Sequence, residues 1–296
     1  MTDPVRRIAD AVLYEGYILW PYRRSATKNR QRWTFGGVYP PAHARAHPDD
    51  PSVLQAQCVL EGSDEVEVQV RFLQVVERGL LDGAGRPVDE LVVSGERYLA
   101  WDEATEREIG PGTFEIPAGA ETEPVPDAAI VRRWRDLRGR VDVDVAGGRV
   151  TVRIENRTPW DGDGREDALR QTFCSTHAVL RTRSGAFVSA TECECDCAGL
   201  WPVLVGEEGA RDTMLAAPII LGDYPQVAPE SPGDLFDATE IDKLLILNVL
   251  ALSPREQEEM RASDPRAREI LDRCASLSSE DLMRLHGAIR EFKPAR

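Results

Sequence analysis

The sequence predicts an α+β fold that is mostly β: an antiparallel β-sandwich-like body with a short N-terminal helix and a C-terminal helical module. From Val53 onward, apolar and polar residues alternate in short segments separated by Gly-rich turns. Helix-capping signals dominate only after Pro229. We therefore expect residues 1–227 to form the sandwich-like body and residues 228–296 to form a helical module packed on it.

The first element predicted is a helix over residues 3–13. Asp3 is suited to the N-cap and Pro4 to the first helical position, where a missing N–H is harmless. Apolar residues then recur with helical spacing on one face, at Val5, Ile8, Ala9 and Val12.

The strands predicted next follow the period-two pattern. Two of them, 54–62 and 66–77, are separated by a turn at 62–64, and shorter ones are expected at 91–93, 98–101 and 113–116. The clearest hairpin pairs valines 141, 143 and 145 with residues 150, 152 and 154 across the turn Ala146-Gly147-Gly148. A second hairpin is expected around residues 183–185.

The C-terminal seventy residues carry four helix starts. The first is near Asp237 or Thr239, and the second is a capping box at Ser253 and Glu256 with proline between them. Asp264, followed by proline, begins the third, and Ser278 begins the last.

The segment Tyr14–Pro41, called here the aromatic-basic segment, holds seven of the nineteen aromatic residues and no acidic residue after Glu15. Three interpretations remain: a packed structural nucleus, a protein-contact surface rich in Trp, Tyr and Arg, or a site that stacks nucleic acid or an anionic ligand. The flanking aromatics are expected in the core. The predicted partner-contact residues are Arg23, Arg24, Lys28, Arg30, Arg32 and Trp33.

The charge is strongly uneven. The formal net charge is -15, of which residues 51–227 carry -14. Such an acidic body repels nucleic acid and anionic membranes, so nucleic acid is an unlikely partner. No apolar run is long enough to cross a membrane and no signal peptide is visible, so no membrane insertion is expected. Six cysteines in 296 residues do not form a disulfide framework, which predicts a cytoplasmic protein.

Four stretches resemble an uncharacterised family of bacterial proteins encoded beside uptake-type [NiFe]-hydrogenase genes. They are LYEGYILWPYRRSATKNRQRWTFGGVYP (13–40), WPVLVGEEG (201–209), APESPGDLFDATEID (228–242) and SDPRAREILDRCASLSSEDLMRLHG (263–287). The resemblance implies a hydrogenase-associated accessory or assembly protein, without supplying catalytic residues. Its expected partner is a hydrogenase subunit or maturation factor, contacted through the Arg23–Trp33 surface and the C-terminal helices.

The alternative function is a metal-handling protein or metalloenzyme. Cys193, Cys195 and Cys197 alternate with acidic residues, so an extended chain would place all three thiols on one face. Thiolates suit zinc or, in a hydrogenase setting, nickel, but a structural zinc site needs a fourth ligand, from Cys174 or His177. The simpler interpretation is an acidic loop or edge strand with cysteines as small fillers. No cofactor is expected under that interpretation.

No motif in the chain predicts a reaction. His43 and His47 have the spacing of helical metal ligands but lack the accompanying glutamate, and Ser25 and Lys28 match a serine-lysine pattern without its companion motifs. Walker A, dinucleotide-binding and nucleophile-elbow motifs are absent from the sequence. We therefore expect a non-enzymatic protein. An enzyme with a cleft between sandwich and helices is the remaining alternative.

Overall fold

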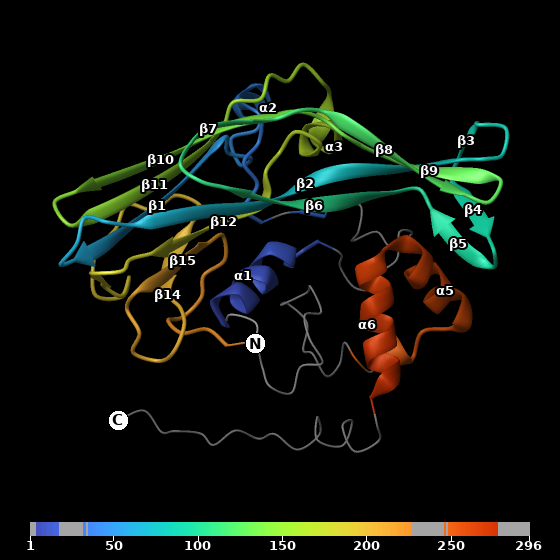
Figure 1. The fold of residues 1–296 in the computed structure, drawn as a ribbon. Coiled ribbons are helices and arrows are strands. Elements are labelled where there is room, and N and C mark those ends of the chain that lie inside the picture. The colour runs from blue at the N-terminus through green and yellow to red at the C-terminus, as the bar shows by residue number, and fades with distance from the viewer. Residues whose placement is uncertain (1–3, 18–31, 34, 227–245, 247, 278–296) are drawn as a thin grey trace.

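The computed structural model describes residues 4–17, 32, 33, 35–226, 246 and 248–277, and it shows two layers of antiparallel sheet with helices beneath them (Figure 1). The five-stranded sheet lies above the eight-stranded sheet, which extends further to the right in Figure 1. The predicted α+β class, mostly β, is confirmed. In the described part of the chain, no helix has the length and apolar character needed to span a membrane.

The five-stranded sheet has the order β13-β1-β11-β10-β7, and every pair is antiparallel. Its strands are β1 (Val53–Glu61), β7 (Gly112–Ile116), β10 (Leu137–Ala146), β11 (Arg149–Asn156) and β13 (Ala186–Phe187). The predicted hairpin is confirmed as β10 and β11, in which Val145 pairs with Val150. Gly147 and Gly148 form its turn with positive φ, which glycine adopts without strain.

The eight-stranded sheet has the order β14-β15-β12-β2-β9-β8, and β2 also pairs with β3 and β6. Its strands are β2 (Glu67–Leu81), β3 (Pro87–Val88), β6 (Trp101–Ile109), β8 (Gly119–Val125), β9 (Ala128–Trp134), β12 (Cys174–Arg181), β14 (Trp201–Leu204) and β15 (Thr213–Ala217). A separate hairpin joins β4 (Glu90–Val93) to β5 (Glu96–Leu99).

Strand β2 is the centre of the second sheet, where it pairs with β3, β6, β9 and β12. Both of its faces are buried over most of its length. Val70 and Phe72 face the sandwich core, whereas Leu73 and Val75 belong to the cluster shared with the helices. A strand covered on both faces loses the alternation of a half-exposed strand. This double burial explains the apolar run that follows Arg71.

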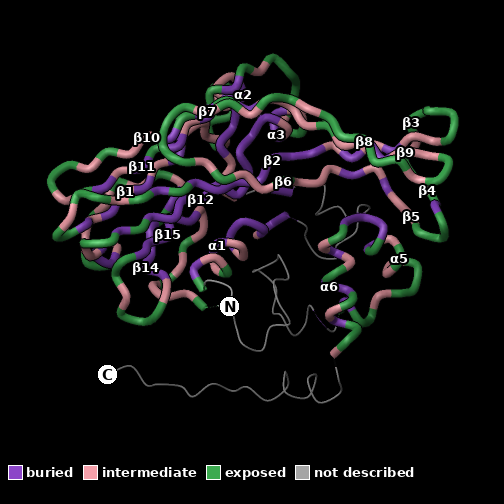
Figure 2. Tube along the Cα trace, viewed as in Figure 1, coloured by how far each residue is buried: buried purple, intermediate pink, exposed green. Residues whose placement is uncertain are grey.

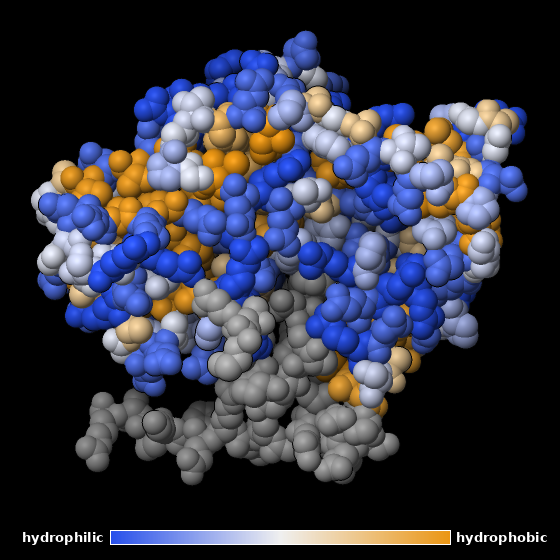
Figure 3. Space-filling view, viewed as in Figure 1, coloured by the Kyte–Doolittle hydropathy of each residue, from blue (hydrophilic) through white to orange (hydrophobic). Residues whose placement is uncertain are grey.

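The sandwich core lies between the two sheets. Leu54, Val141 and Val152 contribute from the first sheet, and Phe72 and Leu180 contribute from the second. The buried residues follow the facing strands in Figure 2. On the face seen in Figure 3, apolar residues gather between the two sheet layers on the left, and hydrophilic residues surround them. This arrangement is the one expected of two sheets that each present an apolar face to the other.

Helix α1 (Pro4–Tyr14) confirms the predicted N-terminal helix and covers the outer face of the second sheet. Its residues Val5, Ala9 and Val12 pack against residues of β12, β14 and β15, including Val179 and Leu215. Two further short helices, α2 (Pro41–Ala46) and α3 (Gly164–Leu169), lie at the top of the molecule in Figure 1.

Helices α5 (Pro254–Ser263) and α6 (Pro265–Ser276) begin where the capping signals place them. Ser253 and Glu256 form the predicted capping box, and the Asp264 side chain accepts a hydrogen bond from the backbone N–H of Arg266. Ile270 and Leu271 pack in one cluster with Leu13 of α1 and with β2 residues. The helix starts near Asp237 and at Ser278 lie outside the described residues.

The second predicted hairpin is wrong. β12 and β13 flank the turn at residues 183–185, but β12 pairs with β2 and β15 while β13 pairs with β1. The turn therefore carries the chain from one sheet to the other. A local turn signal gives the position of a reversal, but it does not give the partner of the strand that follows.

Gly139 offers a test of the packing between the sheets. It lies in β10 beneath aromatic rings, and an added Cβ would lie 2.5 Å from Phe114 and 2.8 Å from Phe173. We expect Gly139→Ala to lower the free energy of unfolding by about 1–3 kcal/mol because the ring positions are fixed by tight packing. Chemical denaturation measures the effect.

The matched control is Gly79→Ala in β2, where the nearest atom to an added Cβ is 3.8 Å away. We expect a change within about 0.5 kcal/mol at this position. Equal stability of the two variants would contradict the packing described between the sheets.

Candidate functional site

A buried arginine stacked between two tryptophans is the most distinctive side-chain arrangement in the described part of the chain. The Arg32 guanidinium carbon lies 4.2 Å from the ring centroid of Trp33 and 3.8 Å from that of Trp101. Its nitrogens donate to the backbone oxygens of Asp102, at 2.6 Å, and Tyr17, at 3.3 Å. Arg32, Trp33 and Trp101 are only 5%, 3% and 8% exposed. We call these three residues the Arg32 stack.

The local backbone around the Arg32 stack is strained and held by neighbours. Trp33 has a φ of 55°, in the left-handed region, which costs an L residue roughly 1–3 kcal/mol. Its N–H donates to Gly16 O at 3.3 Å, and its carbonyl accepts from Arg165 of α3 at 3.0 Å. Burial of the ring and these two bonds offset the strain.

Tyr17 links the Arg32 stack to Asp264, the residue that caps the start of α6. Tyr17 donates to the Asp264 carboxylate at 2.7 Å, and burial together with the Asp264 charge raises the pKa of Tyr17 well above its usual value. Burial lowers the pKa of Arg32, although arginine remains protonated at any ordinary pH. The stack is therefore a cation held among aromatic rings and carbonyl oxygens.

The Arg32 stack forms part of the wall of a cleft of about 1020 Å³. The cleft lies where the C-terminal part of β2 meets strands β4, β5, β6 and β9 and helices α3 and α5. Its wall combines apolar residues with charges of both signs. The charged residues are Arg32, Arg78, Arg97, Arg133, Glu77, Glu90, Asp102, Glu166 and Glu259.

Some of these charges hold the structure together. Arg78 is 6% exposed, pairs with Glu103 at 2.7 Å, and donates to the carbonyls of Ala262 and Ser263 at the end of α5. Arg97 makes a two-bond contact with Glu90, both bonds being 2.8 Å long. Arg78 thus joins α5 to the second sheet and, through the Leu99 carbonyl, the β4–β5 hairpin as well, whereas the Arg97–Glu90 pair holds β4 and β5 together.

Two charged residues of the cleft have no such role. The side chains of Arg133 and Glu166 are exposed, and no side-chain hydrogen bond or ion pair joins either of them to another described residue. Charged side chains without such a partner remain available to a ligand. Arg133 and Glu166 are therefore the best described candidates for contacts made by whatever enters the cleft.

The structure places the predicted partner-contact residues unevenly. Arg32 and Trp33 are buried in the stack, so a partner could reach them only through the cleft. Arg23, Arg24, Lys28 and Arg30 lie outside the described residues. The flanking aromatics Tyr14, Tyr17 and Tyr39 are buried, as predicted. The sequence analysis did not identify Trp101 or Arg133 as site residues, and the one available signal was a tryptophan at the start of the polar segment 101–109.

The three clustered cysteines lie in an extended loop that follows β13. Cys193, Cys195 and Cys197 are half-buried, whereas the acidic residues between them are exposed, so the predicted one-sided alternation is present. The sulfurs of Cys193 and Cys195 are 3.4 Å apart, and Cys197 Sγ contacts the backbone N and O of Gln57. Among the described residues, no group of three or more His, Cys, Asp or Glu side chains is arranged to hold a metal ion.

The expected fourth ligands lie elsewhere. Cys174 and His177 belong to β12 and are 1% and 0% exposed, and burial lowers the pKa of His177 to about 3. The cysteine that accompanies the loop is Cys58 of β1. Burial, and then the charges of the three loop cysteines, raise the pKa of Cys58 to about 12.

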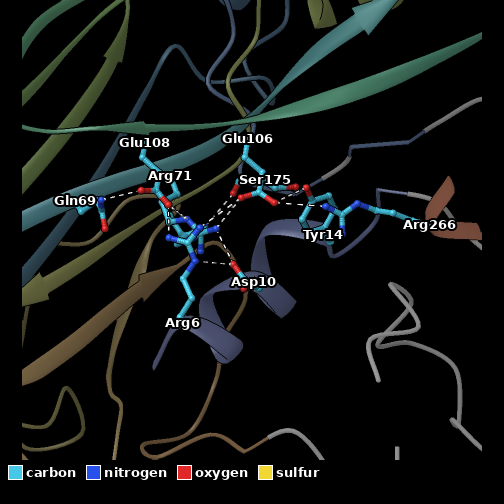
Figure 4. A network of polar contacts seen from close by, with 10 residues as sticks. Arg6, Asp10, Tyr14, Gln69, Arg71, Glu106, Glu108, Ser175 and Arg266 are labelled. Atoms are coloured by element: carbon cyan, nitrogen blue, oxygen red, sulfur yellow. Dashed lines mark hydrogen bonds and ion pairs between the residues drawn. The ribbon is translucent and has the colours of Figure 1, made fainter. Parts of the chain in front are cut away.

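A network of ion pairs and hydrogen bonds around Arg71 connects helices α1 and α6 to the eight-stranded sheet (Figure 4). Arg71 of β2 is 1% exposed and forms ion pairs with Asp10 at 2.7 Å, Glu106 at 3.2 Å and Glu108 at 3.2 Å. Tyr14 donates to Glu106 at 2.6 Å, and the Arg266 guanidinium carbon lies 3.4 Å from the Tyr14 ring centroid. The network joins α1, β2, β6 and α6, so its role is structural.

Comparison of the chain with protein-family models and with curated proteins gave no match. The cleft and the cysteine loop are therefore interpreted from their own geometry.

Proposed function

We propose that this chain is a non-enzymatic accessory or assembly protein that acts by protein-protein contact, and that the cleft beside the Arg32 stack receives a segment of the partner. The observation that carries the proposal is the composition of the cleft. Two tryptophans stacked on an arginine, the residue types enriched where binding energy concentrates, lie beside charged side chains of both signs that have no ion-pair partner among the described residues.

The size and chemistry of the cleft favour a polypeptide over a small molecule. Small-molecule sites of 300–1,000 Å³ are mainly apolar with few polar groups. This cleft has about 1020 Å³ and nine charged residues in its described wall. A peptide segment carrying both acidic and basic side chains complements such a wall.

The chemistry of the wall also favours binding over nucleophilic catalysis. Its described residues are arginines, carboxylates, tryptophans, leucines, glycine and alanine, with no serine, cysteine or histidine among them. Exposed charges such as Arg133 and Glu166 are suited to electrostatic recognition of a partner.

The partner we propose is a subunit or maturation factor of a [NiFe]-hydrogenase. This identity comes from the family resemblance of the four stretches described above, two of which supply Arg32 and Trp33 of the stack and the helix α6. A cytoplasmic location belongs to the same proposal, because all six cysteines are free thiols, as in proteins of reducing compartments.

Affinity purification of the tagged chain from its native cell under gentle conditions tests the proposal. We expect a hydrogenase subunit or maturation factor to be recovered in stoichiometric amount. Recovery of neither would overturn the proposed partner.

Charge reversal at the cleft tests whether the cleft is the contact site. Arg133→Glu is expected to weaken partner binding about 5- to 30-fold, corresponding to about 1–2 kcal/mol for a rim charge that meets an opposite charge. Binding to the purified partner is measured by calorimetry. Stability should be unchanged, since the Arg133 side chain makes no hydrogen bond or ion pair with another described residue.

The matched control is Arg153→Glu, which reverses an exposed arginine of β11 outside the cleft. It should bind as tightly as the wild type at moderate salt. If both variants lose affinity equally, the effect is one of net charge, and the cleft is not the contact site.

A further inference from the structure

The loop that carries Cys193 and Cys195 holds the two thiols in contact. Residues 193–197 alternate between half-buried cysteines and exposed acidic residues, so the thiols share one face. The Sγ atoms of Cys193 and Cys195 lie 3.4 Å apart. A disulfide bond is about 2.0 Å long, so a shift of little more than 1 Å closes the pair.

The other two sulfurs at this site are held differently. Cys197 Sγ lies 3.4 Å from the backbone N and 3.5 Å from the backbone O of Gln57, and thus occupies the open edge of β1. Cys58 points into the sandwich core and is 2% exposed. Only Cys193 and Cys195 are therefore both half-buried and directed at each other.

The loop is anchored between the two cysteines and directly after them. Arg149 donates to the carbonyl oxygen of Glu194 at 2.8 Å, and Gln55 donates to the Asp196 side chain at 3.0 Å. These anchors lie on the neighbouring strands β1 and β11. They hold the loop in the bent path that brings the two sulfurs together.

We propose that Cys193 and Cys195 form a reversible thiol-disulfide site that reacts with small disulfides, preferentially cationic ones. One thiolate of the pair attacks a sulfur of the small disulfide, forms a mixed disulfide and releases one small thiol. The other thiol loses its proton and attacks the protein sulfur of the mixed disulfide. The second small thiol leaves, so two protein thiols are oxidised and one disulfide is reduced to two thiols.

The preference for a cationic disulfide follows from the charges around the pair. Glu192, Glu194 and Asp196 are exposed on the same short loop, whereas Arg149 is the nearby cation. An anionic disulfide such as oxidised glutathione is repelled, and cystamine, which carries two ammonium groups, is attracted. Added salt should reduce the difference in reaction rate between cystamine and oxidised glutathione, because exposed charges are screened.

Burial, together with the hydrogen bond and charge of Cys193, raises the pKa of Cys195 to about 11. The thiolate is the attacking species, so the reaction should accelerate with rising pH between pH 7 and pH 10.

The test incubates the full chain with cystamine or with oxidised glutathione, blocks remaining thiols with N-ethylmaleimide, and digests the protein with trypsin. Arg183 and Arg211 bound one tryptic peptide that carries all three loop cysteines. We expect that peptide to lose two hydrogens and to take a single maleimide, which fragmentation places on Cys197. Cystamine should react at least tenfold faster than oxidised glutathione at low salt.

Two variants complete the test. In Cys195→Ser, a cysteamine adduct should remain on Cys193, because no second thiol can release it. In Cys197→Ser, the pair should still close at the wild-type rate. A wild-type disulfide that includes Cys197 or Cys58, or three thiols that stay reduced in excess cystamine, would overturn the proposal.

Elemental analysis of the untagged protein separates this site from the metal alternative. We expect substoichiometric zinc and nickel that is unaffected by Cys195→Ser. Stoichiometric metal that is lost in Cys195→Ser and blocks oxidation of the wild type would overturn the thiol-disulfide site in favour of a metal centre.

Discussion

Replacing Arg71 with methionine is expected to lower the free energy of unfolding by about 3 kcal/mol, because it removes the buried cation from a group of three carboxylates, which then keep only the more exposed Arg6 and Arg266 as partners. Asp10, Glu106 and Glu108 all lie within 3.2 Å of the Arg71 guanidinium. The methionine retains most of the buried volume, so the loss is electrostatic. Urea denaturation followed by circular dichroism measures it.

A matched control and a compensating change sharpen this prediction. Arg97→Met removes a partly exposed arginine with a good ion pair to Glu90, and it should cost no more than about 1 kcal/mol. The double variant Arg71→Met/Glu106→Gln should recover part of the loss, since it removes one of the three carboxylate charges that have lost their buried partner. If Arg71→Met and Arg97→Met cost the same, the network does not hold the helices to the sheet.

The effect of Arg71 should depend on pH in a defined direction. Burial tends to raise the pKa of Glu106, but the hydrogen bond from Tyr14 and the charges of Arg71 and Arg266 lower it overall from 4.5. A depressed carboxyl pKa stabilises the fold above the unfolded pKa, and this contribution is lost as pH falls through the folded pKa. The difference between the wild type and Arg71→Met should therefore be full at pH 7 and shrink below about pH 4.5. A difference that grows on acidification would contradict this assignment.

Replacing Arg32 with alanine is expected to cost about 3 kcal/mol of stability. The change opens a cavity between Trp33 and Trp101 and removes the donors to the carbonyl oxygens of Asp102 and Tyr17. The near-ultraviolet circular dichroism of the two tryptophans should change with it, because both rings lose the group that separates them.

Two further variants separate packing from charge at Arg32. Arg32→Lys keeps the charge but loses the planar stack and the forked donors, so it should lose at least half as much stability as alanine. Arg32→Met keeps the volume and removes a desolvated charge, so it should be the mildest of the three. If Arg32→Lys is as stable as the wild type, the positive charge alone accounts for the stabilisation, and the planar stack contributes nothing.

Local patterns predicted those elements whose start, face or turn is encoded within a few consecutive residues. The helix Pro4–Tyr14 follows from a proline start and one apolar face, and α5 and α6 follow from their caps. The β10–β11 hairpin follows from alternating valines around Gly147 and Gly148. In each case the signal that starts or turns the element is local, although α1 and α6 then pack on residues far away in the sequence.

Other strands were missed or wrongly paired because their patterns are not local. β8 is almost entirely exposed, so it carries no apolar alternation. β6 pairs with β2 along its length, yet its polar sequence shows no strand signal beyond Trp101. β13 joins a sheet that its preceding turn does not indicate. Their pairing depends on strands that lie far away in the sequence.

In the candidate sites, too, some features are visible in the sequence and others exist only in the folded chain. The sequence alone identified the aromatic-basic segment and the one-sided thiols of Cys193, Cys195 and Cys197, because residue type and spacing are local properties. Only the tertiary structure placed Trp101 against Arg32 and Cys58 beneath the loop. These contacts join residues about seventy and more than a hundred positions apart, so they exist only once the sheets have paired and the helices have packed on them.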